Sequence, residues 1–189
     1  MSLLYRMLGS VTPAAGDAER RQARSQAMAA TAPADWLSQV LRHHQQIEAA
    51  SHAVGACSES RSRTVALKEL SLLLIGHSIA EESVLYPALA RCGGKRHAER
   101  AYSDQAHAKM ELSSLEQLVP VSQQFMEQFE QVRHGVIQHH FEEESHWFME
   151  LLQGAMAEEQ LVLAQRYQQE FDRYVCSDEL LGVLEAVPV

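Results

Sequence analysis

Two histidine–glutamate pairs constrain this 189-residue chain more than any other feature of its sequence. His77 precedes Glu81 by four residues, and His140 precedes Glu144 by the same spacing. On an α-helix this spacing puts both side chains on one face, one turn apart. An imidazole and a carboxylate that converge from one face form half of a metal site. The chain therefore needs a fold that brings two such helices together.

The composition favours an all-α fold, because Ala, Leu, Glu and Gln are abundant and there are only 9 Gly and 5 Pro. Apolar residues recur at spacings of three and four, which is typical of helices that bury one face. Four long segments and a shorter fifth one show this pattern, at about 35–55, 62–92, 97–119, 122–153 and 157–176. Short connections between them predict an antiparallel up-down-up-down four-helix bundle with a short extra C-terminal helix.

We expect three parts along the chain. Residues 1–33, which contain Pro13 and Pro33, are interpreted as a flexible N-terminal arm, with a short helix over 18–30 as a variant of this interpretation. Residues 34–176 form the bundle, and its metal-binding core spans about 35–153. Residues 177–189 form a C-terminal tail.

Charge, hydropathy and cysteine usage exclude several classes of protein. A formal net charge of −9 argues against a nucleic-acid-binding surface, which needs clustered Lys and Arg. The longest apolar run, Leu72–Ile75, is far too short to cross a bilayer. Three widely spaced cysteines indicate a reducing compartment and no thiolate metal site. We therefore expect a cytoplasmic protein without nucleic-acid or membrane partners.

Helical phase selects six candidate metal ligands. His140 shares its phase with apolar residues on both sides and His139 does not, so we expect His140 to point inward and His139 outward. The same test favours His44 over His43, and His107 follows a weaker apolar stripe in the third segment. The spacing of 33 residues from His44 to His77 recurs between His107 and His140, as a faint internal repeat. The expected ligands are His44, His77, Glu81, His107, His140 and Glu144.

The two glutamates carry most of the case for a metal. An ionised glutamate is almost never buried without a partner, and no Lys or Arg lies in phase with Glu81 or Glu144 to compensate it. Metal ions would provide that compensation. Glu48 and Glu111, four residues after two of the histidines, are open as additional ligands, as partners of ligands or as surface residues. Glu82, Glu142 and Glu143 are expected to form a solvated acidic face.

Four imidazoles and two carboxylates without a thiolate suit iron, manganese or zinc. Two carboxylates from opposite helical hairpins can bridge two ions. Such a pair of ions would keep positions open to small ligands, whereas a purely structural zinc site is closed and tetrahedral.

The order His, His-x-x-x-Glu, His, His-x-x-x-Glu resembles that of the hemerythrin-like, or HHE cation-binding, domain. The stretches His77–Pro87 and His139–Phe148 are similar to that family as well, and the resemblance covers about 35–153. It implies an antiparallel four-helix bundle around a non-haem di-iron centre with an oxo or hydroxo bridge, held by the six residues named above. Manganese or zinc in place of iron stays open. Oxygen-carrying hemerythrins have a His-x-x-x-His pair and a His-x-x-x-x-Asp pair, and this chain has neither.

The leading functional hypothesis is a di-iron protein that binds or senses O₂ or NO, or responds to iron or redox state. The alternative is a di-iron oxidoreductase: a peroxidase, an oxidase, or a nitric-oxide-handling or iron-centre repair enzyme. Whether the protein is an enzyme stays open, because no general base or substrate pocket can be identified in the sequence. We expect a monomer or a homodimer.

Two further hypotheses have less support. Ferritin-like iron storage would require Glu-x-x-His pairs on two helices, and only Glu143 and His146 have that spacing. A metal-free helical interaction protein would use the histidines merely as polar core residues.

Overall fold

The computed structural model describes residues 14–176, which are helical and contain no strand. The all-α prediction is therefore confirmed for this part of the chain. No helix in it is both long and apolar enough to cross a membrane. The elements are α2 (Asp17–Ala30), α3 (Trp36–Ala56), α4 (Ser60–Ala80), η1 (Glu81–Leu85), α5 (Tyr86–Arg91), α6 (Lys95–Leu115), α7 (Gln123–Glu142), η2 (Glu143–Trp147), α8 (Phe148–Gly154) and α9 (Ala157–Val175).

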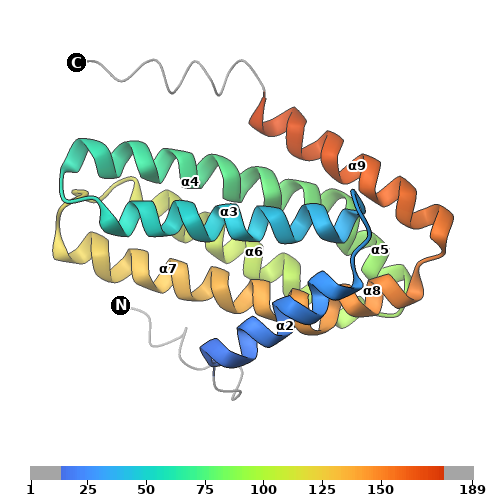
Figure 1. Ribbon diagram of the computed structural model, residues 1–189. Helices are drawn as coiled ribbons and strands as arrows, with labels where there is room; N and C mark the ends of the chain where they lie inside the picture. Colours follow the sequence, from blue (N-terminus) through green and yellow to red (C-terminus); the bar gives the residue numbers. More distant parts are fainter. Residues whose placement is uncertain (1–13, 177–189) are drawn as a thin grey trace.

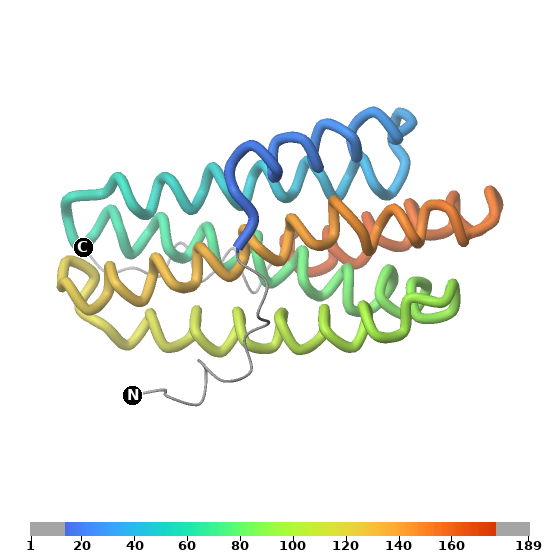
Figure 2. The backbone as a smooth tube through the Cα atoms, turned by 90° about the horizontal axis from the view of Figure 1, so that it is seen from below, coloured from blue at the N-terminus to red at the C-terminus, as the bar shows by residue number. Residues whose placement is uncertain are grey.

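Within the described residues, the long helices α3, α4, α6 and α7 lie side by side, and each runs opposite to the one before it (Figures 1 and 2). Helix α3 packs along α4, and α6 packs along α7, so the chain forms two helical hairpins. Helices α5 and α8 continue α4 and α7 toward one end. Helix α9 then packs across the outside of α4 and α3 (Figure 1).

Helix boundaries follow local chemistry. Asp35, expected from the sequence to begin a helix, caps α3 by accepting the backbone N–H of Ser38 at 2.6 Å. Ser122 caps α7 in the same way, at 3.1 Å from the N–H of Phe125. Gly93 follows α5 at a φ of 110°, a conformation that favours glycine, and the chain turns there into α6.

Two π-helical turns, η1 and η2, interrupt the second helix of each hairpin. In η1 the N–H of Tyr86 bonds to the carbonyl of Glu81, and in η2 the N–H of Phe148 bonds to that of Glu143. A π-turn contains one residue more than an α-turn. The side chains after it therefore point about 100° away from the directions that an uninterrupted α-helix would give them. The two turns begin 62 residues apart, which reveals a repeat of the second half of each hairpin.

The described core consists of two apolar clusters. The cluster at the end near α5, α8 and α9 includes Trp36, Tyr86, Trp147, Phe148 and Tyr167. The cluster at the opposite end includes Val54, Leu70, Leu112, Phe125 and Phe129. Between them every long helix contributes buried polar side chains. This polar layer is His43, His44, His77, Glu81, Gln105, His139, His140, Glu143 and Glu144.

The N-terminal segment differs from the flexible arm expected over 1–33. Its described part contains α2, close to the helix considered over 18–30, and α2 lies against α3, α7 and η2. Ala23 and Ala27 are buried in this contact. Residues 1–13 and the tail predicted at 177–189 lie outside the described residues, so the expected domain limits stay predictions.

Two glycines within helices give a matched test of how α9 is held. A Cβ on Gly76 of α4 would lie 2.8 Å from Val175 Cγ2 and 3.2 Å from Tyr174 Cδ1, whereas a Cβ on Gly135 of α7 would meet nothing within 4 Å. We expect Gly76→Leu to lower the free energy of unfolding by about 1–3 kcal/mol through overpacking. Gly135→Leu should be neutral or slightly stabilising, because leucine favours helix. Urea unfolding followed by circular dichroism measures both, and equal stabilities would contradict the close α4–α9 packing.

Candidate metal centre

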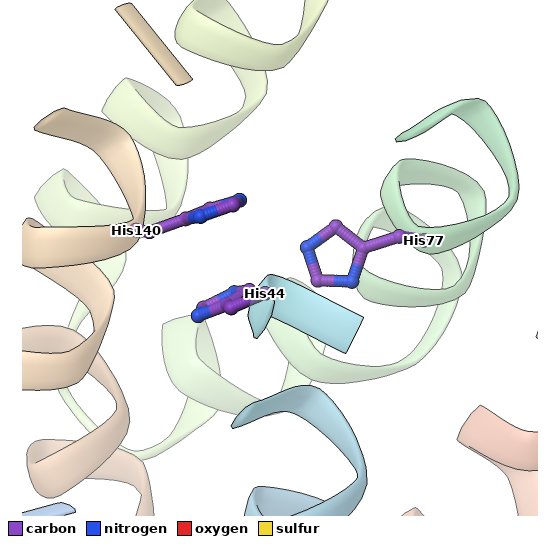
Figure 3. Close-up of side chains that lie close together, drawn as sticks. All are labelled: His44, His77 and His140. Carbon is purple, nitrogen blue, oxygen red and sulfur yellow. The ribbon is translucent and has the colours of Figure 1, made fainter. Parts of the chain in front are cut away.

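Three histidines from three helices face one another in the polar layer (Figure 3). The rings of His44 on α3 and His140 on α7 are stacked, with centroids 3.8 Å apart and planes 8° from parallel. His77 on α4 stands nearly perpendicular to both, with centroid distances of 5.0 Å and 5.8 Å. The side chains of all three are at most 2% exposed.

Two carboxylates complete this group. Glu81 Oε2 lies 3.2 Å from His77 Nε2, and Glu143 Oε2 lies 3.3 Å from His44 Nε2. Both glutamates are fully buried. One donor atom from each of these four residues lies within 4.8 Å of the others, and His44, His77 and His140 form an overlapping group of the same kind.

The donor set fits a metal ion because its atoms lack other partners. His44 Nε2, His77 Nε2, Glu81 Oε1 and Glu143 Oε2 are buried and accept or donate no hydrogen bond. A buried polar atom without a partner costs about 1–3 kcal/mol, so four of them around one point are unfavourable as a structural feature alone. Imidazole nitrogen and carboxylate oxygen are ligands of iron, manganese and zinc. A cation at this point would satisfy all four atoms.

Electrostatics in the metal-free layer supports this interpretation. Burial, and then the charge of Glu143, raise the pKa of Glu81 to about 7, so this carboxyl group is only partly ionised near neutral pH. Burial opposes ionisation of Glu143, but the charge of His139 holds its pKa well below the usual value. Burial also lowers the pKa of His77, which keeps this imidazole neutral, as a ligand must be. Burial opposes protonation of His44, but the nearby carboxylates of Glu143 and Glu144 raise its pKa well above the usual value, so a metal ion would displace a proton there.

The structure brings four of the six residues predicted from the sequence into these two groups. His44, His77 and Glu81 lie in the four-residue group, and His140 lies in the overlapping one. The other two lie in neither group: Glu144 accepts a hydrogen bond from His44 Nδ1 at 2.7 Å, and His107 is exposed on α6. Ligation by any of the six stays a prediction.

Three expectations about orientation are wrong. His139 was expected to point outward and Glu143 to belong to a solvated face, but they are 7% and 0% exposed. His43 was also expected to point outward, and it is 2% exposed. The error on α7 came from continuing α-helical phase through η2, where the π-turn shifts the faces. A signal was available, because His77-x-x-x-Glu81-Glu82 recurs 62 residues later as His139-x-x-x-Glu143-Glu144.

A residue of α9 orients one of the candidate ligands. The Tyr167 hydroxyl, fully buried, lies 2.9 Å from His77 Nδ1 and 2.9 Å from His43 Nδ1. It bonds to the ring nitrogen that faces away from the four-residue group, and so fixes the direction in which His77 Nε2 points. Partners of this kind raise metal affinity by holding a ligand in place.

Helix α2 braces the neighbouring ligand. Arg24 donates to Glu144 Oε1 at 2.6 Å and to Glu48 Oε1 at 2.7 Å, and Glu144 holds His44. Arg24 compensates the negative charge of Glu144, so this carboxylate needs no metal ion for that purpose. Arg24 lies far from Glu144 in the sequence, outside the metal-binding core predicted at about 35–153.

A cavity of about 270 Å³ lies between α6 and α7. Gln105, His139 and His140 of the polar layer line it, together with His107 and Asp104 on α6. Asp104 Oδ2 lies 3.6 Å from His139 Nδ1. This space connects the buried polar layer with the surface of the α6–α7 hairpin.

Comparison with known proteins agrees with this geometry. A family model, the hemerythrin HHE cation-binding domain, matches residues 36–171, which is most of the chain. The chain therefore belongs to the hemerythrin HHE cation-binding family, as the motif order indicated. A search of curated proteins and a search of solved structures each gave no match.

Removal of the Tyr167 hydroxyl tests its positioning role. We expect Tyr167→Phe to lower metal affinity by about 10- to 100-fold, because His77 loses the bond that fixes its ring. Competition with a chelator measures the affinity, and circular dichroism checks that the helices remain. Tyr102→Phe is the control, since that hydroxyl bonds to the backbone carbonyl of Glu82 on the exposed side of α6. Equal losses in both variants would contradict the role of Tyr167.

Arg24→Met tests the brace from α2 in the metal-free protein. Its partner Glu144 is buried while Arg24 is partly exposed, so we expect a loss of about 2 kcal/mol near pH 7, between the values for exposed and buried pairs. Burial opposes ionisation of Glu144, yet His44 and Arg24 lower its pKa below 4.5. The stabilisation is thus present above about pH 4.5 and fades as the pH falls below it. Urea titrations of wild type, Arg24→Met and the exposed control Arg21→Met measure this, and a difference that persists unchanged in acid would count against it.

Proposed function

We propose that this protein holds two iron ions in its polar layer and binds or senses a small ligand such as O₂ or NO there. The observation that carries the proposal is the convergence of four buried, unpartnered donor atoms, from His44, His77, Glu81 and Glu143, in a chain of the HHE cation-binding family. Iron at this site would supply redox chemistry and positions for a diatomic ligand. Manganese and zinc also accept imidazole and carboxylate ligands and are the alternatives to iron at this site.

In the proposed ligand arrangement, His44, His77, Glu81 and Glu143 would hold iron. His139 Nε2, 3.2 Å from Glu143 Oε1, repeats the 3.2 Å spacing of His77 and Glu81 and serves the second ion. His140, stacked on His44, is a further candidate. Glu144 is assigned to orienting His44, and His107 to the cavity.

We also propose a bundle topology and a cellular location for this protein. The alternating directions of α3, α4, α6 and α7 support an antiparallel up-down-up-down four-helix bundle of the family's type, with α9 added to it (Figures 1 and 2). Free cysteines at positions 57, 92 and 176 support a cytoplasmic, reducing location.

The cavity between α6 and α7 supports access by a small ligand, because it reaches His139 and His140 from the surface. It also favours the second candidate function, a di-iron oxidoreductase. Asp104 on the wall of this cavity, 3.6 Å from His139 Nδ1, would provide a carboxylate that accepts or delivers a proton. Consumption of peroxide or NO by the iron-loaded protein would distinguish an enzyme from a carrier or sensor.

Iron counting on matched variants tests the site. We expect about two ions per chain after anaerobic reconstitution with ferrous iron, and a spectrum that changes on addition of NO or azide. Glu143→Gln and His139→Ala should lose iron, whereas Glu82→Gln and His107→Ala should retain it. Loss of iron from His107→Ala with retention in Glu143→Gln would instead favour the ligand set expected from the sequence. A wild-type protein that binds no iron would refute the proposed function.

A further inference from the structure

The two halves of the polar layer are related by a repeat, but they do not carry the same donors. His77 and Glu81 on one side correspond to His139 and Glu143 on the other, with Nε2–Oε distances of 3.2 Å in each pair. From the first helix of each hairpin, however, α3 contributes the imidazole of His44 and α6 contributes the amide of Gln105. Helix α6 therefore gives an amide to the layer at the place where α3 gives an imidazole.

The hydroxyl of Tyr86 lies in that half. It is fully buried, 2.8 Å from Glu143 Oε1, 3.1 Å from Glu81 Oε2 and 3.1 Å from His139 Nε2. Gln105 Nε2 donates to the same oxygen at 3.0 Å. The residue 62 positions after Tyr86 is Phe148, which has no hydroxyl. The repeat therefore provides a phenol at only one of its two equivalent positions.

This hydroxyl is surrounded by groups of the kind that bind a metal ion. Two carboxylate oxygens and an imidazole nitrogen lie within 3.1 Å of its oxygen. All three are ligand types that iron accepts. Both glutamates and Tyr86 are fully buried, so water does not compensate the carboxylates. A cation at this point would take the place of the protons in the cluster, and each surrounding oxygen or nitrogen could then direct a lone pair at it.

We propose that Tyr86 is a metal ligand, whose phenolate oxygen joins His139 Nε2 on the second of the two ions, with Glu81 and Glu143 shared between both. This inference rests on the proposed function, since it requires that iron binds in the polar layer. The ion takes the place of the phenolic proton, which is released to solvent as the metal binds. The donors around His139 then include a phenolate, which the donors around His44 and His77 lack.

This asymmetry has a chemical consequence. An anionic oxygen donor stabilises the higher charge of ferric iron more than a neutral imidazole does. The ion at Tyr86 should therefore stay ferric under conditions that reduce its neighbour. Phenolate bound to ferric iron also absorbs visible light, a property that histidine and carboxylate ligands do not give.

The test is a comparison of Tyr86→Phe with wild type after iron loading and oxidation. Wild type should show a visible phenolate-to-iron band and, on excitation in it, resonance Raman modes of the tyrosine ring that shift with ring-deuterated tyrosine. Tyr86→Phe should lose the band and drop from about two ions to about one per chain, since the second site loses an anionic ligand. Tyr102→Phe is the control, since its hydroxyl bonds to the backbone carbonyl of Glu82, and it should retain the band.

The outcomes separate this inference from the function on which it rests. Wild type with two ions and no phenolate modes, or a Tyr86→Phe variant that retains them, would overturn the role of Tyr86 and leave the di-iron proposal intact. Wild type without iron would overturn both. If Tyr86→Phe does not fold, the labelled wild-type spectrum decides on its own, because it identifies tyrosine ligation without a variant.

Discussion

The burial of negative charge between two apolar clusters is the constraint on which the rest of this structure depends. Glu81, Glu143 and Glu144 are at most 2% exposed, and ionised carboxylates at such depth require compensation. Arg24 provides it for Glu144. In the metal-free layer partial protonation of Glu81 and an ion pair between Glu143 and His139 provide it for the other two. A metal ion that binds here would displace protons from these groups. The buried carboxylates therefore destabilise the metal-free layer and favour the binding of a cation.

The π-turns make this concentration of polar groups possible. A regular α-helix presents one residue in every three or four to a given face, but α7 and η2 together bury His139, His140, Glu143 and Glu144. The extra residue in η2 rotates the chain so that the aromatic side chains of Trp147 and Phe148 still enter the apolar cluster beyond. Turn η1 likewise allows both Glu81 and, five residues later, Tyr86 to be buried. Helices interrupted in this way often mark functional sites.

Much of this arrangement could be predicted from the sequence, and the failures have identifiable physical causes. Periodicity located the long helices, and the residues selected on α3, α4 and α7 as inward-facing are buried: His44, His77, Glu81, His140 and Glu144. His139 and Glu143 were missed because the phase test admitted one face of a regular α-helix, whereas α7 and η2 bury neighbouring positions, and a π-turn has no clear signature in a single sequence. Arg24 and Tyr167 were missed for another reason: they come from α2 and α9, whose contacts are tertiary and leave no periodic pattern. For His107 the apolar stripe was weak, and it lies on the exposed side of α6.

The two outer helices brace the imidazoles of one half of the polar layer. Helix α2 holds His44 through Arg24 and Glu144, and α9 holds His77 through Tyr167, so both imidazoles of the first half are braced from outside the bundle. No such brace covers His139 within the described residues: its neighbour is Asp104 on α6, and the cavity between α6 and α7 opens beside it. The α3–α4 half of the layer is thus held by hydrogen bonds from two outer helices, whereas Gln105, His139 and His140 line the cavity between α6 and α7. The cavity therefore adjoins the half in which Gln105 and Tyr86 depart from the repeat.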